Sequence, residues 1–440
     1  MEKQQRHTII LFIIIVLVSL GYVAVQKYYI EKDIEIVDEK IKEKSNVSFL
    51  NTNSKTWNSD IKKLKQDAIF LDNVELQIRI QELLASLGQY NTELRYSVNE
   101  DDNSEKRYSQ DMHVYPISLK WIGDDLLIES AAYEYKDIVG SRLTEINNMK
   151  IEDVISKISK LVSYENKAGL RYRALEYMTV YEYLRYYQVI DIDEIEIKIK
   201  DRYGEVRTRR INPIRAYSFI DLEDKNKLYK MTIPNSKNKS IPFKRGEKVF
   251  DDYEYTYVKN KILYIKIKSL LDDGYLKFDE SLNELLKYKN GEIDKVVLDL
   301  RDSHGGKYSF ANRIVDTLKV GTGDKNIKYY VLINGGTYSS SIDLAFLANK
   351  DLKAKVIGGD ITASPVSSGE VKAAKLSELD CLIRYCTRLY DQAELGDVQN
   401  KKSSIILSGN TLKTRLYLKQ KYNNYIRGID DFYEYVVNDN

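Results

Sequence analysis

Two short segments of this chain bring together residues that could perform acyl transfer. One segment, residues 335–340, places Ser339 shortly after a Gly-Gly pair, and the other, residues 301–306, ends in Gly305 and Gly306. Consecutive glycines let backbone N–H groups approach a reacting carbonyl without side-chain obstruction. A hydroxyl beside such donors is what nucleophilic acyl transfer requires. The alternative is that Ser339 only caps a helix, because serine is a preferred N-cap residue.

The elements around these segments predict an α/β fold. Short apolar runs at 295–300, 328–334 and 354–358 have the composition of buried strands, and residues 310–320 and 341–349 carry apolar side chains at helical spacing. Strands that alternate with helices indicate βαβ units and a parallel sheet. The carboxyl ends of parallel strands meet at one edge of the sheet, so we expect the two segments to lie close together there.

These motifs resemble the tail-specific (C-terminal-processing) serine proteases, a family that includes tricorn-like cores. The resemblance runs from about Trp57 to the C-terminus, and its clearest parts are Asp299-Leu-Arg301 with the following glycines and the stretch from Val331 to Ser340. It implies a crotonase-like ββα protease core. It also implies that Ser339 is the nucleophile and that Gly305, Gly306, Gly336 and Ser340 form the oxyanion and substrate loops.

The usual partners of the family's serine are replaced in this chain. In the tricorn-like branch a loop near the N-terminal helices carries a catalytic histidine, and here that loop has Asn91 in the run Gly88-Gln-Tyr-Asn-Thr92. An amide cannot accept a proton from serine. The other branch uses a lysine, and its position is occupied by Ser364. These departures place the activity in question.

Other residues could assist Ser339. Of the chain's 3 histidines, His304 lies in the glycine loop itself and is the candidate surrogate base, since imidazole is the commonest general base. Glu370 stands in a Gly-Glu step similar to one in the family and could orient a partner or a substrate amine. The alternative for Glu370 is an ordinary surface salt bridge.

Composition excludes several other classes of function. The 440 residues are 43% hydrophobic, which is enough for two or three domains with cores of their own. Lys and Arg (68) nearly balance Asp and Glu (66), so a nucleic-acid partner is not expected. No metal-ligand spacing and no phosphate-binding glycine loop occurs, so we expect no metal and no cofactor. Cys381 and Cys386 lie five positions apart on one expected strand, so unless a turn intervenes they are too far apart for a disulfide and are free, buried thiols.

The N-terminus carries the longest apolar stretch, residues 8–25. At about 1.5 Å per residue it approaches the ~30 Å of a hydrocarbon core, so residues 1–26 are predicted to be a single transmembrane anchor with the catalytic part outside the cytoplasm. A cleaved signal peptide is the alternative. Residues 27–56 are expected to form a stalk and linker, whose apolar stripe could support self-association.

The remainder divides into three expected regions. Residues 57–112 form an N-terminal helical region, residues 113–215 a PDZ-like α+β insert, and residues 216–440 the protease core. A PDZ-like module binds peptide ends by strand addition, whereas the alternative is an ordinary spacer domain.

Two functions remain open from the sequence. The first is a membrane-anchored serine endopeptidase that acts on polypeptides. The second is a catalytically inactive relative, a pseudoenzyme that binds peptides through the same groove. The retained Ser339 and glycines favour the first function, whereas Asn91 and Ser364 favour the second.

Overall fold

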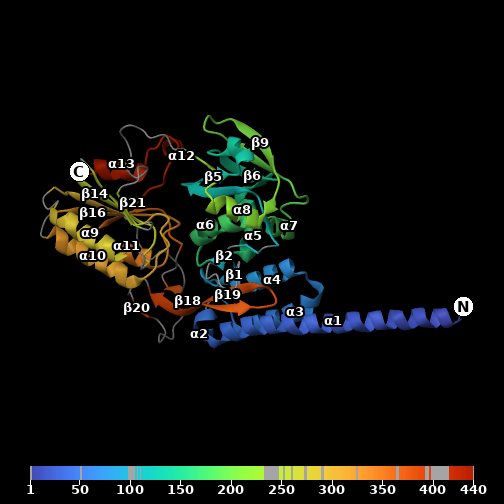
Figure 1. Ribbon diagram of the computed structural model, residues 1–440. Helices are drawn as coiled ribbons and strands as arrows, with labels where there is room; N and C mark the ends of the chain where they lie inside the picture. The colour runs from blue at the N-terminus through green and yellow to red at the C-terminus, as the bar shows by residue number, and fades with distance from the viewer. Residues whose placement is uncertain are drawn as a thin grey trace.

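A computed structural model describes most of the chain. The described residues are 2–49, 52–97, 105–106, 108–109, 111–231, 247–250, 253–258, 261–271, 275–288, 292–323, 326–362, 366–391, 396–397 and 416–439. Figure 1 shows a layered α/β core beside a second, largely antiparallel unit, and a long N-terminal helix whose first half extends away from both.

A seven-stranded mixed sheet forms the core. Its order is β12-β13-β14-β15-β16-β17-β21, antiparallel from β12 to β14 and parallel from β14 onward. The parallel strands predicted at 295–300, 328–334 and 354–358 are confirmed. The strands are β12 (Glu247–Phe250), β13 (Tyr253–Val258), β14 (Ile262–Ile267), β15 (Lys295–Asp299), β16 (Lys328–Ile333), β17 (Lys355–Gly358) and β21 (Leu416–Tyr417).

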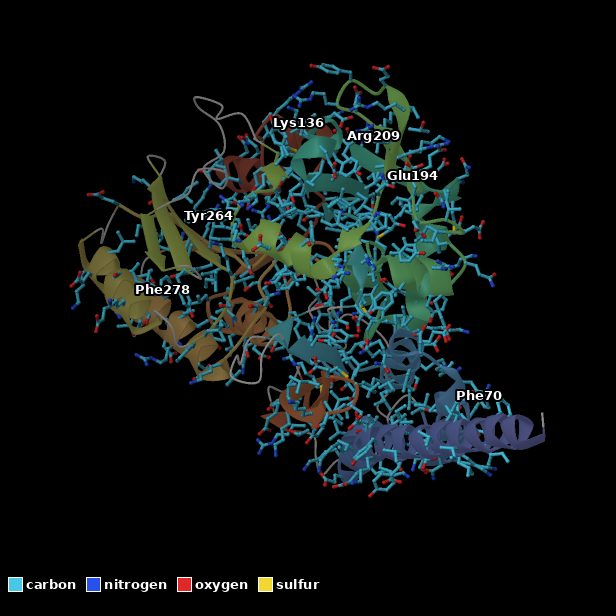
Figure 2. The ribbon with its side chains drawn as sticks, turned by 45° about the vertical axis from the view of Figure 1, so that its right-hand side comes forward. Phe70, Lys136, Glu194, Arg209, Tyr264 and Phe278 are labelled. Carbon is cyan, nitrogen blue, oxygen red and sulfur yellow. The ribbon has the colours of Figure 1, made fainter. Side chains whose placement is uncertain are left out.

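Helices cover both faces of this sheet because its strand side chains alternate between two apolar clusters. One face packs on α9 (Tyr275–Tyr288), α10 (Tyr308–Thr322) and α11 (Ser340–Asp351). The opposite face packs on α13 (Asp431–Asn438), which follows the short α12 (Tyr422–Tyr425). Figure 2 shows Phe278 on α9 and Tyr264 on the sheet, and these side chains belong to the two different clusters.

The second unit is built on an antiparallel sheet of order β11-β5-β6-β8-β9, with β4 paired to β5 and β7 paired to β6. Its helices pack into the largest apolar cluster of the molecule. The elements are β3 (His113–Val114), β4 (Ile117–Ile122), β5 (Asp125–Ala131), η2 (Tyr133–Ile138), β6 (Arg142–Ile146), β7 (Met149–Lys150), α5 (Ile151–Ile158), η3 (Ser159–Leu161), α6 (Lys167–Tyr177), α7 (Tyr181–Tyr186), β8 (Ile195–Lys200), β9 (Val206–Ile211), β10 (Ile214–Arg215), α8 (Ala216–Asp224) and β11 (Tyr229–Lys230).

A third sheet joins distant parts of the chain. The hairpin of β18 (Val366–Leu376) and β19 (Cys381–Asp391) pairs with β1 (Glu93–Ser97), which follows the N-terminal helices. Both cysteines of β19 are free and buried, as predicted. The other elements here are α2 (Ser45–Ser48), α3 (Ser54–Asp67), η1 (Ala68–Phe70), α4 (Asn73–Ala85), β2 (Glu105–Lys106) and β20 (Gly396–Asp397).

The first helix, α1 (Glu2–Glu43), corrects the predicted anchor. Among the residues that the structure describes, no helix combines the length and apolar character needed to cross a bilayer. The predictions of a transmembrane helix at 1–26, of a membrane contact through residues 8–25 and of a single-pass membrane location are therefore wrong.

The second half of α1 is packed on the body of the protein rather than standing free as a stalk. Ile34, Val37 and Ile41 are fully buried in the chain's own apolar cluster. The buried Asp33 carboxylate accepts hydrogen bonds from the N–H groups of Ser377, Glu378 and Leu379 at the tip of the β18–β19 hairpin. The apolar stripe that suggested self-association is thus used inside the chain, and self-association remains a prediction.

Candidate active site

Ser339 stands at the point where β16 gives way to α11. It is the N-cap residue of α11, but its side chain makes no capping hydrogen bond, and its backbone has φ 54° and ψ −138°. This conformation is unfavourable for a residue with a Cβ and persists only where the surroundings enforce it. A strained serine on a strand-to-helix turn exposes its hydroxyl at the carboxyl edge of a sheet. The capping-only interpretation therefore does not account for Ser339.

The glycine loop that follows β15 packs directly against Ser339. A Cβ added to Gly305 would lie 2.6 Å from the Ser339 Cβ and 2.8 Å from the Ser340 nitrogen. Gly305 and Gly306 have φ values of +78° and +146°, and a Cβ at Gly306 would overlap the Leu270 carbonyl. The close approach predicted from the sequence is therefore present, and it requires glycine at both positions.

Hydrogen bonds fix the two loops to each other. Ser340 Oγ donates to the Gly306 carbonyl at 2.7 Å, and the Tyr338 N–H donates to the Ser303 carbonyl at 2.9 Å. The hydroxyls of Ser303 and Ser341 share a hydrogen bond of 2.6 Å beneath them. Both loops are thus held in one geometry before any substrate arrives, which is the condition for electrostatic preorganisation.

Unused backbone donors surround Ser339. Among the described residues, the N–H groups of Gly305, Gly306 and Ser340 donate to no protein acceptor. The Ser340 N–H also lies in the first turn of α11, where the helix dipole favours negative charge. Gly336 differs, because its N–H donates to Asn334 Oδ1 at 2.9 Å and so shapes the turn instead.

Asn91 lies close to the serine loop but contacts the neighbouring residue. Its Nδ2 donates to the Tyr338 hydroxyl at 3.0 Å. The Tyr338 ring is stacked on Tyr90 with centroids 3.8 Å apart, and burial raises the pKa of Tyr338 well above its ordinary value. The loop where the resemblance implies a histidine therefore holds a partly buried contact between an amide and a tyrosine. Sequence reasoning found Asn91 but not Tyr338, which has no local signal.

In the part of the chain that the structure describes, the other predicted assistants form no hydrogen bond or ion pair with Ser339. The side chain of His304 is exposed, and its backbone N–H donates to the Lys268 carbonyl. Glu370 lies on β18 with φ 49° and forms an ion pair with Arg388. Ser364 lies outside the described residues.

Asp343 is a titratable group near the site that sequence reasoning missed. It lies in the first turn of α11, four residues after Ser339, and burial raises the pKa of its carboxyl to about 7. Burial and the charge of Asp343 raise the pKa of Tyr308 at the start of α10, so Asp343 and Tyr308 are close to each other. No sequence motif marks such a residue, because the shift comes only from the packing of two helices.

A buried ion-pair cluster braces the start of the glycine loop. Arg301 donates to both carboxylate oxygens of Asp299 at 2.8 Å and to Asp430 Oδ2 at 2.7 Å. Burial alone would raise the pKa of Asp299, but the charges of Arg301 and Lys266 hold it below its ordinary value. Asp430 also caps α13, so one carboxylate links the C-terminal helix to the glycine loop. Among the described residues, no group of three or more possible ligands could hold a metal ion.

Solved structures share this fold. The chain aligns with mature CPAF with a TM-score of 0.61 at 10% identity, over 94% of this chain and 97% of that chain. The structure of mature CPAF complexed with lactacystin aligns with a TM-score of 0.59 at 10% identity, over 94% of this chain and 100% of that one. The photosystem II D1 C-terminal processing protease has a TM-score of 0.42 at 11% identity, over 90% and 94%.

The two CPAF structures bear on the fold alone, since each is 10% identical to this chain, and the TM-score of 0.42 carries no argument. No protein-family model and no curated protein matches the sequence. The α/β core expected from the resemblance is present, with a strained serine and a glycine loop at the carboxyl edge of its parallel strands. The resemblance to the tail-specific, C-terminal-processing serine proteases is thereby confirmed at the level of the fold.

Proposed function

We propose that this chain is a serine-type endopeptidase that cleaves polypeptides by acyl transfer through Ser339. The observation that carries the proposal is the strained Ser339 backbone beside the unused N–H groups of Gly305, Gly306 and Ser340. Strain of this kind costs about 1–3 kcal/mol, and its persistence beside free donors is typical of a functional site. The fold shared with mature CPAF, whose structure includes a complex with lactacystin, supports the same conclusion.

The chemistry follows from these groups. Ser339 Oγ attacks the carbonyl carbon of the scissile peptide bond, and the resulting oxyanion accepts hydrogen bonds from the free backbone amides. The Ser339 proton passes to a base and then to the leaving amine. Water hydrolyses the acyl-enzyme and returns the proton to Ser339.

His304 is the base in this proposal. It directly precedes Gly305, whose backbone abuts Ser339, and its exposed ring has no partner among the described residues. Contacts of catalytic groups are often long before substrate binds and tighten afterwards, so His304 would reach Ser339 once a substrate is bound. Glu370 would orient a substrate amine only after release from Arg388.

The proposal retains the expected division into an N-terminal helical region, a PDZ-like insert and a protease core. In the insert, β4 pairs only with β5 among the described strands, so β4 offers an edge for strand addition by a peptide. Because β1 pairs with β19, the helical region and the core also share a sheet.

Hydrolysis of a fluorescently labelled unstructured protein by the full chain tests the proposal. We expect Ser339→Ala to abolish turnover and His304→Ala to lower the rate about 10²–10⁴-fold. His113→Ala is the matched control, because His113 is bound to Glu182 Oε1 at 2.9 Å and should leave the rate unchanged. Turnover that survives Ser339→Ala would refute the assignment.

A second candidate function is peptide binding without cleavage. The observation in its favour is the Asn91–Tyr338 hydrogen bond, which occupies the position expected for a proton acceptor. Saturable binding of the labelled protein with no turnover and no modification of Ser339 would identify this function.

A further inference from the structure

A cavity of about 490 Å³ lies between the antiparallel unit and the carboxyl edge of the core sheet. Its walls come from β4, α6, the ends of β14 and β15, the loops after β15, β16 and β17, and residues 417–420, 425, 430 and 432. A cavity of this size holds a small organic ligand. Ser339 does not line it, so the cavity is distinct from the candidate active site, although Asn334 and Gly335 of the serine loop form part of its wall.

Most of the charges in the wall neutralise one another. Arg301 lies 2.7 Å from Asp430, Lys120 lies 3.2 Å from Asp302, and Lys266 lies 3.4 Å from Asp299. Burial alone would raise the pKa of Asp302, but Lys120 and Lys266 hold it below its ordinary value, so these carboxylates stay charged and paired. This part of the wall has no charge left to offer a ligand.

Positive charge remains on the α6 side of the cavity. Arg171 donates to the carbonyls of Gly123 and Asp124 at 3.2 and 3.0 Å, and among the described residues no carboxylate forms an ion pair with Arg171 or Lys167. Lys419 is already paired with Asp124 at 2.7 Å. Arg171 and Lys167 carry two positive charges, and the remaining carboxylate in the wall is Asp360. The wall on this side therefore has a surplus of one positive charge.

Arg171 is held in a fixed orientation. Its guanidinium carbon lies 3.5 Å from the centre of the Trp121 ring, and Trp121 Nε1 donates to the Arg171 carbonyl at 2.9 Å. A stacked guanidinium loses little conformational freedom when it binds a carboxylate. Burial lowers the pKa of Arg171 even though the charges of Asp124, Glu152 and Asp125 act to raise it, so these carboxylates compensate the cation only in part.

The rest of the wall suits a flat apolar group. Aromatic rings line it from several elements: Trp121, Tyr172, Tyr417, Tyr425 and Phe432. Aromatic side chains pack well against another ring, by stacking or by edge-to-face contact. The cavity thus places a positive charge that nearby carboxylates compensate only in part beside a set of aromatic rings.

We propose that this cavity binds a singly charged carboxylate that carries an aromatic group, with the carboxylate at Arg171 and Lys167 and the ring among the aromatic side chains. A free aromatic acid and the last residue of a polypeptide share this chemistry. The proposal does not depend on cleavage by Ser339, so it is tested in a Ser339→Ala background.

Tryptophan fluorescence measures this binding directly. The chain has two tryptophans, and Trp57 is 1% exposed and lies away from the cavity, so Trp57→Phe leaves Trp121 as the single reporter. We expect N-acetyl-L-phenylalanine to produce a saturable change in fluorescence and to bind at least tenfold more tightly than its neutral carboxamide.

Substitutions locate the charge that recognises the ligand. Arg171→Gln should weaken binding of N-acetyl-L-phenylalanine at least tenfold, whereas Arg202→Gln, at an exposed turn outside the cavity, should leave it unchanged. Because Arg171→Gln also removes the stacking on Trp121, Lys167→Gln provides a second variant at an exposed position. We expect it to weaken binding about threefold or more even if Arg171→Gln does not fold.

A pentapeptide that ends in phenylalanine distinguishes the two sources. Binding at least tenfold tighter than that of N-acetyl-L-phenylalanine, and lost on carboxamidation, would identify a polypeptide end. Equal or weaker binding would identify a free acid. No fluorescence change with either acid up to about 10 mM, or equal affinity for acid and carboxamide, would overturn the proposal.

Discussion

Replacing Gly305 by alanine should damage both the stability and the chemistry of this protein. A new Cβ would meet the Ser339 Cβ at 2.6 Å, the Tyr338 carbonyl oxygen at 2.7 Å and the Ser340 nitrogen at 2.8 Å. Two of these atoms belong to the backbone and cannot move away by a change of rotamer. We expect the free energy of unfolding to fall by about 1–3 kcal/mol because of the positive φ, and by about 1–3 kcal/mol more because of the overlap.

Gly323→Ala separates these two costs. Gly323 also has a positive φ, +61°, but a Cβ there would meet nothing within 4 Å. The urea midpoint of unfolding should therefore fall in both variants and should fall further in Gly305→Ala, by the equivalent of about 2 kcal/mol. The rate of Ser339 modification by a fluorophosphonate should drop about 100-fold or more only in Gly305→Ala, because the overlap displaces the nucleophile. Equal midpoints and equal modification rates would refute the close packing of the two loops.

Further predictions concern buried carboxylates. Because burial raises the pKa of Asp343 to about 7, above its ordinary 3.8, the folded protein should lose stability as pH rises from about 4 to about 7. Asp343→Asn should thus raise the urea midpoint at pH 8 by the equivalent of about 4 kcal/mol and leave it unchanged at pH 4. A gain that is the same at both pH values would contradict this. Asp430 is 1% exposed and paired with Arg301, so Asp430→Asn should lower the free energy of unfolding by about 3 kcal/mol. Asp294→Asn, which breaks an exposed ion pair with Lys261, should lower it by less than about 1 kcal/mol. Equal effects would contradict the role of Asp430 in bracing the glycine loop.

The arrangement of the core could be predicted because its signals are local. Apolar runs that alternate with helical spacing indicate strands and helices one at a time, and parallel strands necessarily end at a common edge. Ser339 and Gly305 follow neighbouring strands, β16 and β15, so their proximity follows from topology alone.

The remaining features depend on contacts between distant residues. Arg301 binds Asp430 across 129 positions, and Asn91 binds Tyr338 across 247. The charge surplus beside Trp121 likewise becomes visible only when neutralising pairs are counted in space. No periodicity or spacing within one segment carries such information.

The N-terminus shows how a local signal can mislead. The apolar stretch at 8–25 suggested a membrane anchor, but hydropathy does not report what the rest of the helix contacts. Asp33, ordinarily an exposed residue, is buried because three backbone N–H groups of a hairpin more than 340 positions away donate to it.

Mass spectrometry of the full chain after treatment with a fluorophosphonate tests the central claim most directly, because the adduct reports a nucleophilic hydroxyl without a known substrate. We expect a single adduct on the peptide that contains Ser339, and none in Ser339→Ala. An adduct on another residue, or none on the folded wild-type protein, would contradict the account.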